Sequence, residues 1–165
     1  NKRKPNRYLE CENEKIVSKK LIFELPKRIV YQNIMSSVPK VVAALETKKR
    51  PTDDTLNNLV INNSKYLHEY ILAILNSQIA TFYLKYRIFN CATLTVHLDK
   101  PYLGELPIKN VELSTQKNIS HLVNNLVDLK EKNSNTEKEE NALSEILYKI
   151  YGLNEDDINM IENLS

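Results

Sequence analysis

The chain has 165 residues, of which 42% are hydrophobic and 27% charged, and its formal net charge is +2. This composition is typical of a globular protein, and no apolar run reaches the roughly 20 residues that a membrane-spanning helix needs. The length allows one domain with a real core, with or without an appendage. The basic start, NKRKPNR, has neither an apolar stretch behind it nor an initiator Met. We therefore expect no signal peptide and interpret the chain as a piece of a longer protein or a processed product.

Charge is distributed unevenly along the chain. Residues 1–110 carry 18 Lys and Arg against 10 Asp and Glu, a balance of +8. Residues 111–165 carry 5 against 11, a balance of −6. A basic lobe joined to an acidic one indicates two separate roles. The basic first part is suited to binding a polyanion, and the acidic second part should be repelled by one.

The first 61 residues contain several short runs that predict β-strands. After a basic arm at residues 1–7, residues 8–12 alternate like a short edge strand. Three further runs are rich in β-branched or apolar residues and are bounded by turn formers. They are residues 28–34, 40–45 and 56–61. The charges and the proline of residues 46–55 are costly to bury, so we expect an exposed loop there.

From Lys65 the apolar residues recur at steps of three and four, which predicts one helical face. The positions are Leu67, Ile71, Ile74, Leu75, Ile79, Phe82 and Tyr83. We expect one long helix that starts after Ser64 as its N-cap and ends near Tyr86. A polar loop at residues 87–98 follows, with a short strand at residues 93–98. A turn at Gly104 then leads into extended residues 106–108.

The tail predicts two helices and a short third one. One apolar stripe is Ile119, Leu122, Val123, Leu126 and Leu129, and the other is Leu143, Ile146, Leu147 and Ile150. The short break at residues 133–136 should make these helices antiparallel. Gly152 suits the left-handed end of the second helix, and Asn154 suits the cap of the third. The fold class is therefore α+β: a small mixed β-sheet lobe with a long core helix (1–110), then an antiparallel helical hairpin (111–165).

No catalytic or metal-binding motif is visible. Neither of the two glycines lies in a phosphate-binding loop, and the three histidines lie far apart. Cys11 and Cys91 lack metal-ligand spacing, and we favour buried or idle thiols in a reducing cytoplasm over the alternative of a disulfide. The pair Asp53-Asp54 invites a nuclease interpretation, but the acidic-x-Lys that usually follows is missing. A solvated loop explains these two carboxylates better.

Two groups of basic residues adjoin short polar side chains, and this is the pattern expected of a DNA-binding surface. The first group is Lys48, Lys49 and Arg50 with Thr52; the second is Lys85 and Arg87 with Asn90, Thr93, Thr95 and His97. Cations fix a protein on phosphates, and polar side chains read base edges. Taken singly, each cation is more often a solubilising surface charge than a phosphate contact. A histidine such as His97 is likewise more often a packing residue than a reader of base edges. Their grouping is what indicates nucleic acid.

The order of the segments resembles a known family. It runs from KRIVYQNIMSSVPKVVAAL at residues 27–45, through LNNLVI, to the helix YILAILNSQIATFYLKY and a loop ending in LGELPI. With Leu75-Asn76-Ser77 inside the helix and Leu106-Pro107-Ile108 at the close, it is similar to the target-recognition domain of restriction–modification proteins. Within these it resembles the TaqI-like specificity domain, a relative of type I specificity subunits. The end, ILYKIYGLNEDDINMIE at residues 146–162, looks like the helical spacer of such domains.

The resemblance implies recognition of double-stranded DNA without chemistry in this piece. The partners would be the methyltransferase domain, with or without a nuclease domain, of a restriction–modification or phage-defence protein. That methyltransferase would act on adenine N6 and use S-adenosylmethionine, whereas this piece would hold no cofactor and no metal. Loops 46–55 and 87–98 would meet DNA, and the acidic hairpin would serve as a spacer or docking arm. The alternative from another class is a protein-interaction module whose basic lobe binds an acidic protein surface; a self-contained enzyme is least favoured.

Overall fold

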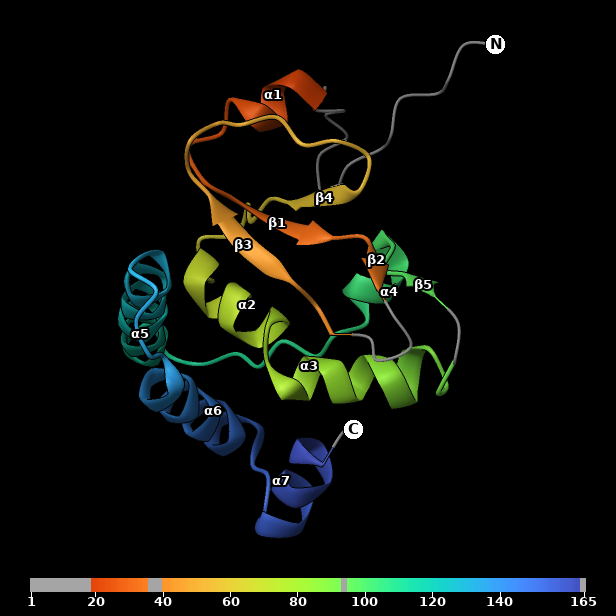
Figure 1. Ribbon diagram of the computed structural model, residues 1–165, viewed down its shortest axis with the longest axis vertical. Helices are drawn as coiled ribbons and strands as arrows, with labels where there is room; N and C mark the ends of the chain where they lie inside the picture. The colour runs from red at the N-terminus through yellow and green to blue at the C-terminus, as the bar shows by residue number, and fades with distance from the viewer. Residues whose placement is uncertain (1–18, 36–39, 93–94, 164–165) are drawn as a thin grey trace.

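A small antiparallel sheet forms the centre of the first half of the molecule (Figure 1). The computed structural model describes residues 19–35, 40–92 and 95–163, so the expected arm at residues 1–7 and strand at residues 8–12 lie outside the described residues. The central strand β1 (Arg28–Gln32) pairs with β3 (Ala43–Glu46) on one side and β4 (Leu56–Leu59) on the other. The three expected strands are confirmed with shifted ends. All described strand pairs are antiparallel, where a mixed sheet was expected.

Each face of this sheet has a different covering. Along β1, Ile29 and Tyr31 are buried in the core on the side of helix α2 (His68–Leu75), whereas Arg28 faces away from it. Because β3 and β4 both run antiparallel to β1, the chain between them must cross from one end of the sheet to the other. Residues 47–55 make this crossing over the face opposite α2, beside the short helix α1 (Lys19–Phe23) (Figure 1).

The expected long helix is wrong in two respects: it is broken at Asn76-Ser77, and it starts later than expected. It consists of α2, α3 (Gln78–Tyr83) and the π-helical turn η1 (Leu84–Ile88). Ser77 is extended at ψ 157°; its Oγ donates to Ile74 O at 2.7 Å and accepts from Ala80 N at 3.2 Å. Such side chains compete with helical backbone bonds, which explains the break.

The helix begins at His68, and Leu67 rather than Ser64 is its N-cap. The reason is a turn ahead of it, in which Asn63 Oδ1 accepts from Lys65 N at 2.9 Å and Asn63 O accepts from Tyr66 N at 3.2 Å. An asparagine that bonds to the backbone two residues on favours a turn over a helix. The apolar period therefore predicts a helix that is too long at its N-terminal end.

Two small elements lie between η1 and the tail. The expected strand at residues 93–98 is present as β5 (Val96–His97), which pairs with β2 (Ile34–Met35). A short helix, α4 (Lys100–Gly104), with a proline in its first turn, replaces the simple turn expected at Gly104.

The tail has the expected helices. They are α5 (Leu113–Glu131), α6 (Glu137–Tyr151) and α7 (Glu155–Glu162). Gly152 ends α6 at φ 72°, in the left-handed region that favours glycine. Asn154 and Asp157 form a reciprocal capping box at the start of α7. The α+β fold class with a helical hairpin is confirmed.

The hairpin packs directly on the first part of the chain. Helix α5 lies against α2 (Figure 1), and Ile119 of α5 belongs to the same buried cluster as Ile71 of α2. Gln116 is only 1% exposed; its Oε1 accepts from Leu67 N at 2.8 Å and its Nε2 donates to Lys65 O at 2.9 Å. The core is therefore continuous, and the division at residue 110 stays a prediction.

Candidate nucleic-acid interface

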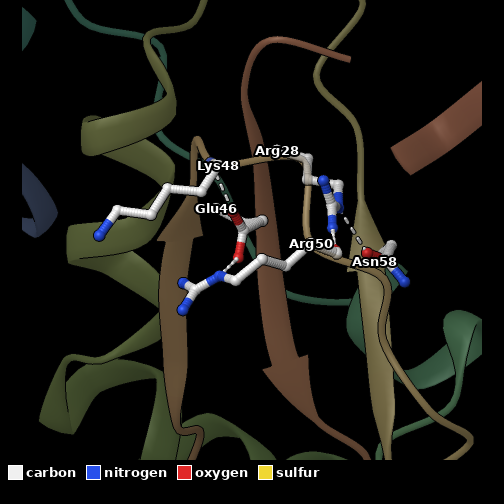
Figure 2. Close-up of polar contacts among 5 residues, drawn as sticks. All are labelled: Arg28, Glu46, Lys48, Arg50 and Asn58. Carbon is white, nitrogen blue, oxygen red and sulfur yellow. Dashed lines mark hydrogen bonds and ion pairs between the residues drawn. The ribbon is translucent and has the colours of Figure 1, made fainter. Parts of the chain in front are cut away.

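A buried polar network holds the crossing loop 47–55 over the sheet. Arg28 starts β1, is 0% exposed and pairs in register with Glu46 at the end of β3. Its Nε donates to Asn58 Oδ1 at 2.8 Å, and its Nη2 donates to the main-chain O of Arg50 (Figure 2). Hydrogen bonds offset part of the cost of burying a guanidinium, and the buried Nη1 of Arg28 has no partner among the described residues. Arg28 therefore holds the loop backbone against the sheet face that points away from α2.

Glu46, which precedes the loop, holds the same part of it. This carboxylate accepts from Lys48 N at 2.5 Å and from Arg50 Nε at 2.8 Å. Burial alone would raise the pKa of Glu46, but the Lys48 amide and the Arg50 guanidinium outweigh it, so its pKa lies below the ordinary value. Glu46 therefore stays ionised at neutral pH and keeps both loop residues in place.

The structure leaves the first basic group largely on the surface. The Lys48 side chain extends away from the network (Figure 2), and that of Arg50 is 66% exposed beyond its contact with Glu46. Lys49 has φ 56° and lies 3.7 Å from Glu24, but both side chains are more than half exposed, so this ion pair is weak. Thr52 differs, because its Oγ1 accepts from Asn58 at 2.7 Å and so belongs to the network.

The second basic group lies where the long helix ends. Lys85 and Arg87 are in η1, and Lys85 Nζ lies 5.5 Å from the centroid of the Tyr86 ring. Asn90 (φ 46°) and Cys91 (φ 57°) then reverse the chain, and Cys91 N donates to Lys85 O at 2.8 Å. Left-handed backbone of this kind is uncommon for residues with a Cβ. The turn presents Arg87 and Asn90 to solvent.

The remaining polar candidates are on or beside β5. Thr95 and His97 are exposed, so His97 does not have the packing role that a histidine more often takes. Thr93 lies outside the described residues. The assignment of all ten candidate residues to DNA contact stays a prediction.

One residue, Asn33, joins the two expected DNA-binding loops. It stands between β1 and β2, where its N–H donates to Thr55 O at 3.0 Å and its O accepts from Leu98 N at 2.8 Å. Ile34, its neighbour, pairs with His97. The ends of loop 46–55 and loop 87–98 therefore lie side by side, held by main-chain bonds.

The cationic parts of the two loops do not meet. In Figure 1 residues 47–55 arch over the top of the sheet beside α1, whereas η1 lies at the far end of α3, toward the bottom of the view. Polar residues at the joined ends are thus flanked by one basic group on each side. The sequence did not reveal this role of Asn33, since it depends on which strands pair. Arg28 and Glu46 could have been noticed as charges within apolar strands.

The acidic pair of loop 47–55 has a structural role. Asp53 Oδ1 accepts from Thr55 N at 2.9 Å and from Thr55 Oγ1 at 2.6 Å, which shapes a turn. Among the described residues, no three His, Cys, Asp or Glu side chains gather as metal ligands. No helix in the described ranges is long and apolar enough to cross a membrane.

Comparison with known families agrees with this architecture. The family model of the TaqI-like C-terminal specificity domain matches residues 2–108, which include the sheet, the crossing loop, the broken helix and the segment up to Ile108. No curated protein matches the chain. The matched residues make up more than half of the 165. The chain therefore belongs to the TaqI-like C-terminal specificity domain family, the DNA-specificity domains of restriction–modification enzymes.

Proposed function

We propose that this chain is the target-recognition module of a restriction–modification or phage-defence adenine-N6 DNA methyltransferase and performs no chemistry itself. It would read double-stranded DNA by sequence. The observation that carries the proposal is the tether at Asn33, which joins the ends of both loops while a basic group stands on each side.

This arrangement suits the geometry of duplex DNA. Two phosphate backbones flank each groove, and base edges are accessible only between them. Phosphate contacts fix the position and orientation of a protein on the duplex, and contacts to base edges provide specificity. Flanking cations with polar side chains between them fit that division of tasks.

Each candidate residue has a role in the proposal. Lys48, Lys49, Lys85 and Arg87 would contact phosphates, together with the outward nitrogens of Arg50. Asn90, Thr93, Thr95 and His97 would read base edges. Thr52 would act indirectly, because its hydroxyl oxygen is engaged by Asn58. Residues 1–110 would form the recognition lobe.

The acidic hairpin would contact other domains of the parent protein rather than the DNA. Its balance of −6 over residues 111–165 disfavours the phosphate backbone, so it would turn the basic lobe toward the duplex. The hairpin would act as a spacer or docking arm for a methyltransferase domain, with or without a nuclease domain. That methyltransferase would bring S-adenosylmethionine. The assembly would act in the cytoplasm.

Binding of duplex DNA across a salt series tests the proposal. The probe is a pool of labelled random-sequence duplexes, from which bound sites are selected and sequenced, followed by anisotropy titrations of the selected duplex. The variant Lys48→Ala/Lys49→Ala removes two cations without touching the buried network. We expect weaker binding and a slope of log K against log salt that is smaller by about 2. The matched control, Lys117→Ala/Lys132→Ala, removes two exposed cations from the hairpin and should bind like the parent chain.

Two results would overturn the proposal. One is selection that enriches no sequence from the random pool. The other is unchanged affinity and unchanged salt slope in the Lys48/Lys49 variant. A partner protein that binds the basic lobe at high salt and excludes DNA would favour the protein-interaction alternative instead.

A further inference from the structure

The sheet face that points away from α2 is buried at one end and exposed at the other. On β1, Gln32 alternates with the buried Tyr31 and therefore points away from α2, as Arg28 does. At the Arg28 end, residues 47–55 and their polar network cover this face. At the opposite end of β1, Gln32 is exposed to solvent. The same face therefore anchors the crossing loop at one end and presents a side chain at the other.

The strand register places an aliphatic side chain on each side of Gln32. Leu56 of β4 is its partner on one side, and Val42, just before β3, accepts from Gln32 N at 3.0 Å on the other. Directly opposed residues of antiparallel strands point to the same face of a sheet. Val42 is 56% exposed and Leu56 is 36% exposed. These three residues, Gln32, Val42 and Leu56, form one exposed row across the sheet, which we call the Gln32 patch.

The chemistry of the Gln32 patch matches an A·T base pair. The hydrogen bonds of Gln32 with described residues use its main chain, and none uses its side-chain amide. A glutamine amide pairs bidentately with adenine in the major groove, because its Oε1 accepts from N6 while its Nε2 donates to N7. Apolar side chains contact the C5-methyl group of thymine. The row therefore has both kinds of group that distinguish an A·T pair from a G·C pair.

The position of the patch fits the candidate nucleic-acid interface. Asn33, the next residue after Gln32, carries the main-chain tether that joins the ends of the two loops. Ile34 is 40% exposed and pairs with His97, one of the proposed base readers. Three neighbouring strands span roughly 10 Å, and the major groove is about 12 Å wide. The row is thus narrow enough to face base edges while the basic groups on either side meet phosphates.

We propose that the Gln32 patch reads an A·T base pair of the target site in the major groove. The Gln32 amide pairs with N6 and N7 of the adenine, and Leu56 or Val42 packs on the C5-methyl of a thymine in the same or the adjacent pair. Single exposed aliphatic residues are common on protein surfaces, but here two of them flank an amide beside the tether. This role rests on the proposed function and adds to it one base pair that the target site must contain.

A duplex with one altered adenine atom tests the contact of Gln32. The probe is the duplex that the parent chain selects from the random pool, with each adenine replaced in turn by 7-deazaadenine, which lacks the N7 acceptor. We expect Gln32→Ala to weaken binding of the unmodified duplex by about 5- to 150-fold, the usual range for one bidentate base contact. One 7-deazaadenine should weaken binding by the parent chain but not by the variant. Gln78→Ala, which removes an exposed glutamine from α3, is the matched control and should behave like the parent chain.

Removal of a thymine methyl group tests the aliphatic contacts. Each thymine of the selected duplex is replaced in turn by uracil, which differs only in lacking the C5-methyl. We expect one replacement to weaken binding by the parent chain and to have no further effect on Val42→Ala/Leu56→Ala. Val127→Ala, at a position of α5 that is 41% exposed, is the control and should keep the sensitivity of the parent chain to uracil.

The outcomes separate this role from the proposed function. A parent chain that selects no sequence would overturn both. A parent chain that selects a site, together with a Gln32→Ala variant that binds this site equally well, would overturn the role of the patch alone. Affinity for random-sequence duplexes and the salt slope should be unchanged in Gln32→Ala, since phosphate contacts determine them. An equal loss on random and selected duplexes would therefore also overturn the role of the patch.

Discussion

Asn76 binds Ala43 as if it were a neighbouring strand. Its Nδ2 donates to Ala43 O and its Oδ1 accepts from Ala43 N, each at 3.0 Å, and Nδ2 also lies 3.3 Å from Leu72 O. The residue thus satisfies the edge of β3 and marks the break between α2 and α3 at the same time. The Leu-Asn-Ser motif of the sequence therefore has a physical purpose: it joins the sheet to the broken helix.

Removal of this amide should destabilise the fold. We expect Asn76→Ala to lower the free energy of unfolding by about 1–2 kcal/mol, because two bonds to a strand edge are lost. Asn76→Asp should cost more, since its carboxylate cannot donate to Ala43 O and repels it. Urea unfolding followed by circular dichroism measures both. Gln78→Ala, an exposed neighbour on α3, is the control and should change stability by less than about 0.5 kcal/mol.

The buried Glu46 should make stability depend on acid pH. Its pKa is lowered in the folded chain, so its contribution is fully present above the ordinary glutamate pKa of 4.5 and is lost as the pH falls through the folded value. We expect unfolding free energy to decrease below about pH 4.5, and Glu46→Gln to be less stable at neutral pH but to lose less on acidification. Chemical denaturation at a series of pH values tests this. Equal slopes for both proteins would contradict it. Glu69 and Glu140, whose pKa values are also lowered in the folded chain, contribute a residual slope in the variant.

Gln116 should be the costliest polar residue of the hairpin to replace. It makes three hydrogen bonds to the main chain, the third being Nε2 to Val111 O at 3.2 Å. Gln116→Leu keeps most of the volume but leaves Leu67 N and Lys65 O without their partner. We expect a loss of about 2–4 kcal/mol in thermal or urea unfolding. Gln78→Leu, the same change at an exposed site, serves as the control. A loss no larger than that of the control would remove Gln116 from its anchoring role.

Arg87 tests the second basic group for DNA binding. We expect Arg87→Ala to weaken binding to the selected duplex by about 1–3 kcal/mol, the usual cost of one phosphate or base contact. Anisotropy titrations at two salt concentrations distinguish these two kinds of contact, because only a phosphate contact lowers the salt slope on every sequence. Lys132→Ala, on the hairpin, is the control. Unchanged affinity would exclude η1 from the interface.

Local patterns predicted the strands and the tail well. The apolar run around Ile29 and the caps at Gly152 and Asn154 depend only on neighbouring residues, and the structure has them where they were expected. The helix break could not be read from the apolar period, since Leu75 and Ile79 keep helical spacing across it. The break depends on Ser77 and on the contact of Asn76 with a strand far away in the sequence.

The candidate site was less predictable for the same reason. Exposed cations such as Lys48 and Arg87 could be chosen from charge alone, but their separation in space follows from the crossing of residues 47–55 over the sheet. Thr52 was selected as a polar loop residue, yet its bond to Asn58 arises only after β4 has paired with β1. Long-range pairing decides which polar residues are free, and a single sequence does not contain it.

The tether at Asn33 uses only main-chain atoms of the two loops, and this has a consequence for how new specificities arise. None of the side chains at residues 52–54 or 95–97 takes part in the bonds of Asn33 with Thr55 O and Leu98 N. In the proposed DNA-reading role, these side chains could therefore change one at a time while the main-chain bonds of Asn33 stay in place. This part of the support is independent of side-chain identity, unlike the network of Arg28, Glu46 and Asn58 that holds the crossing loop.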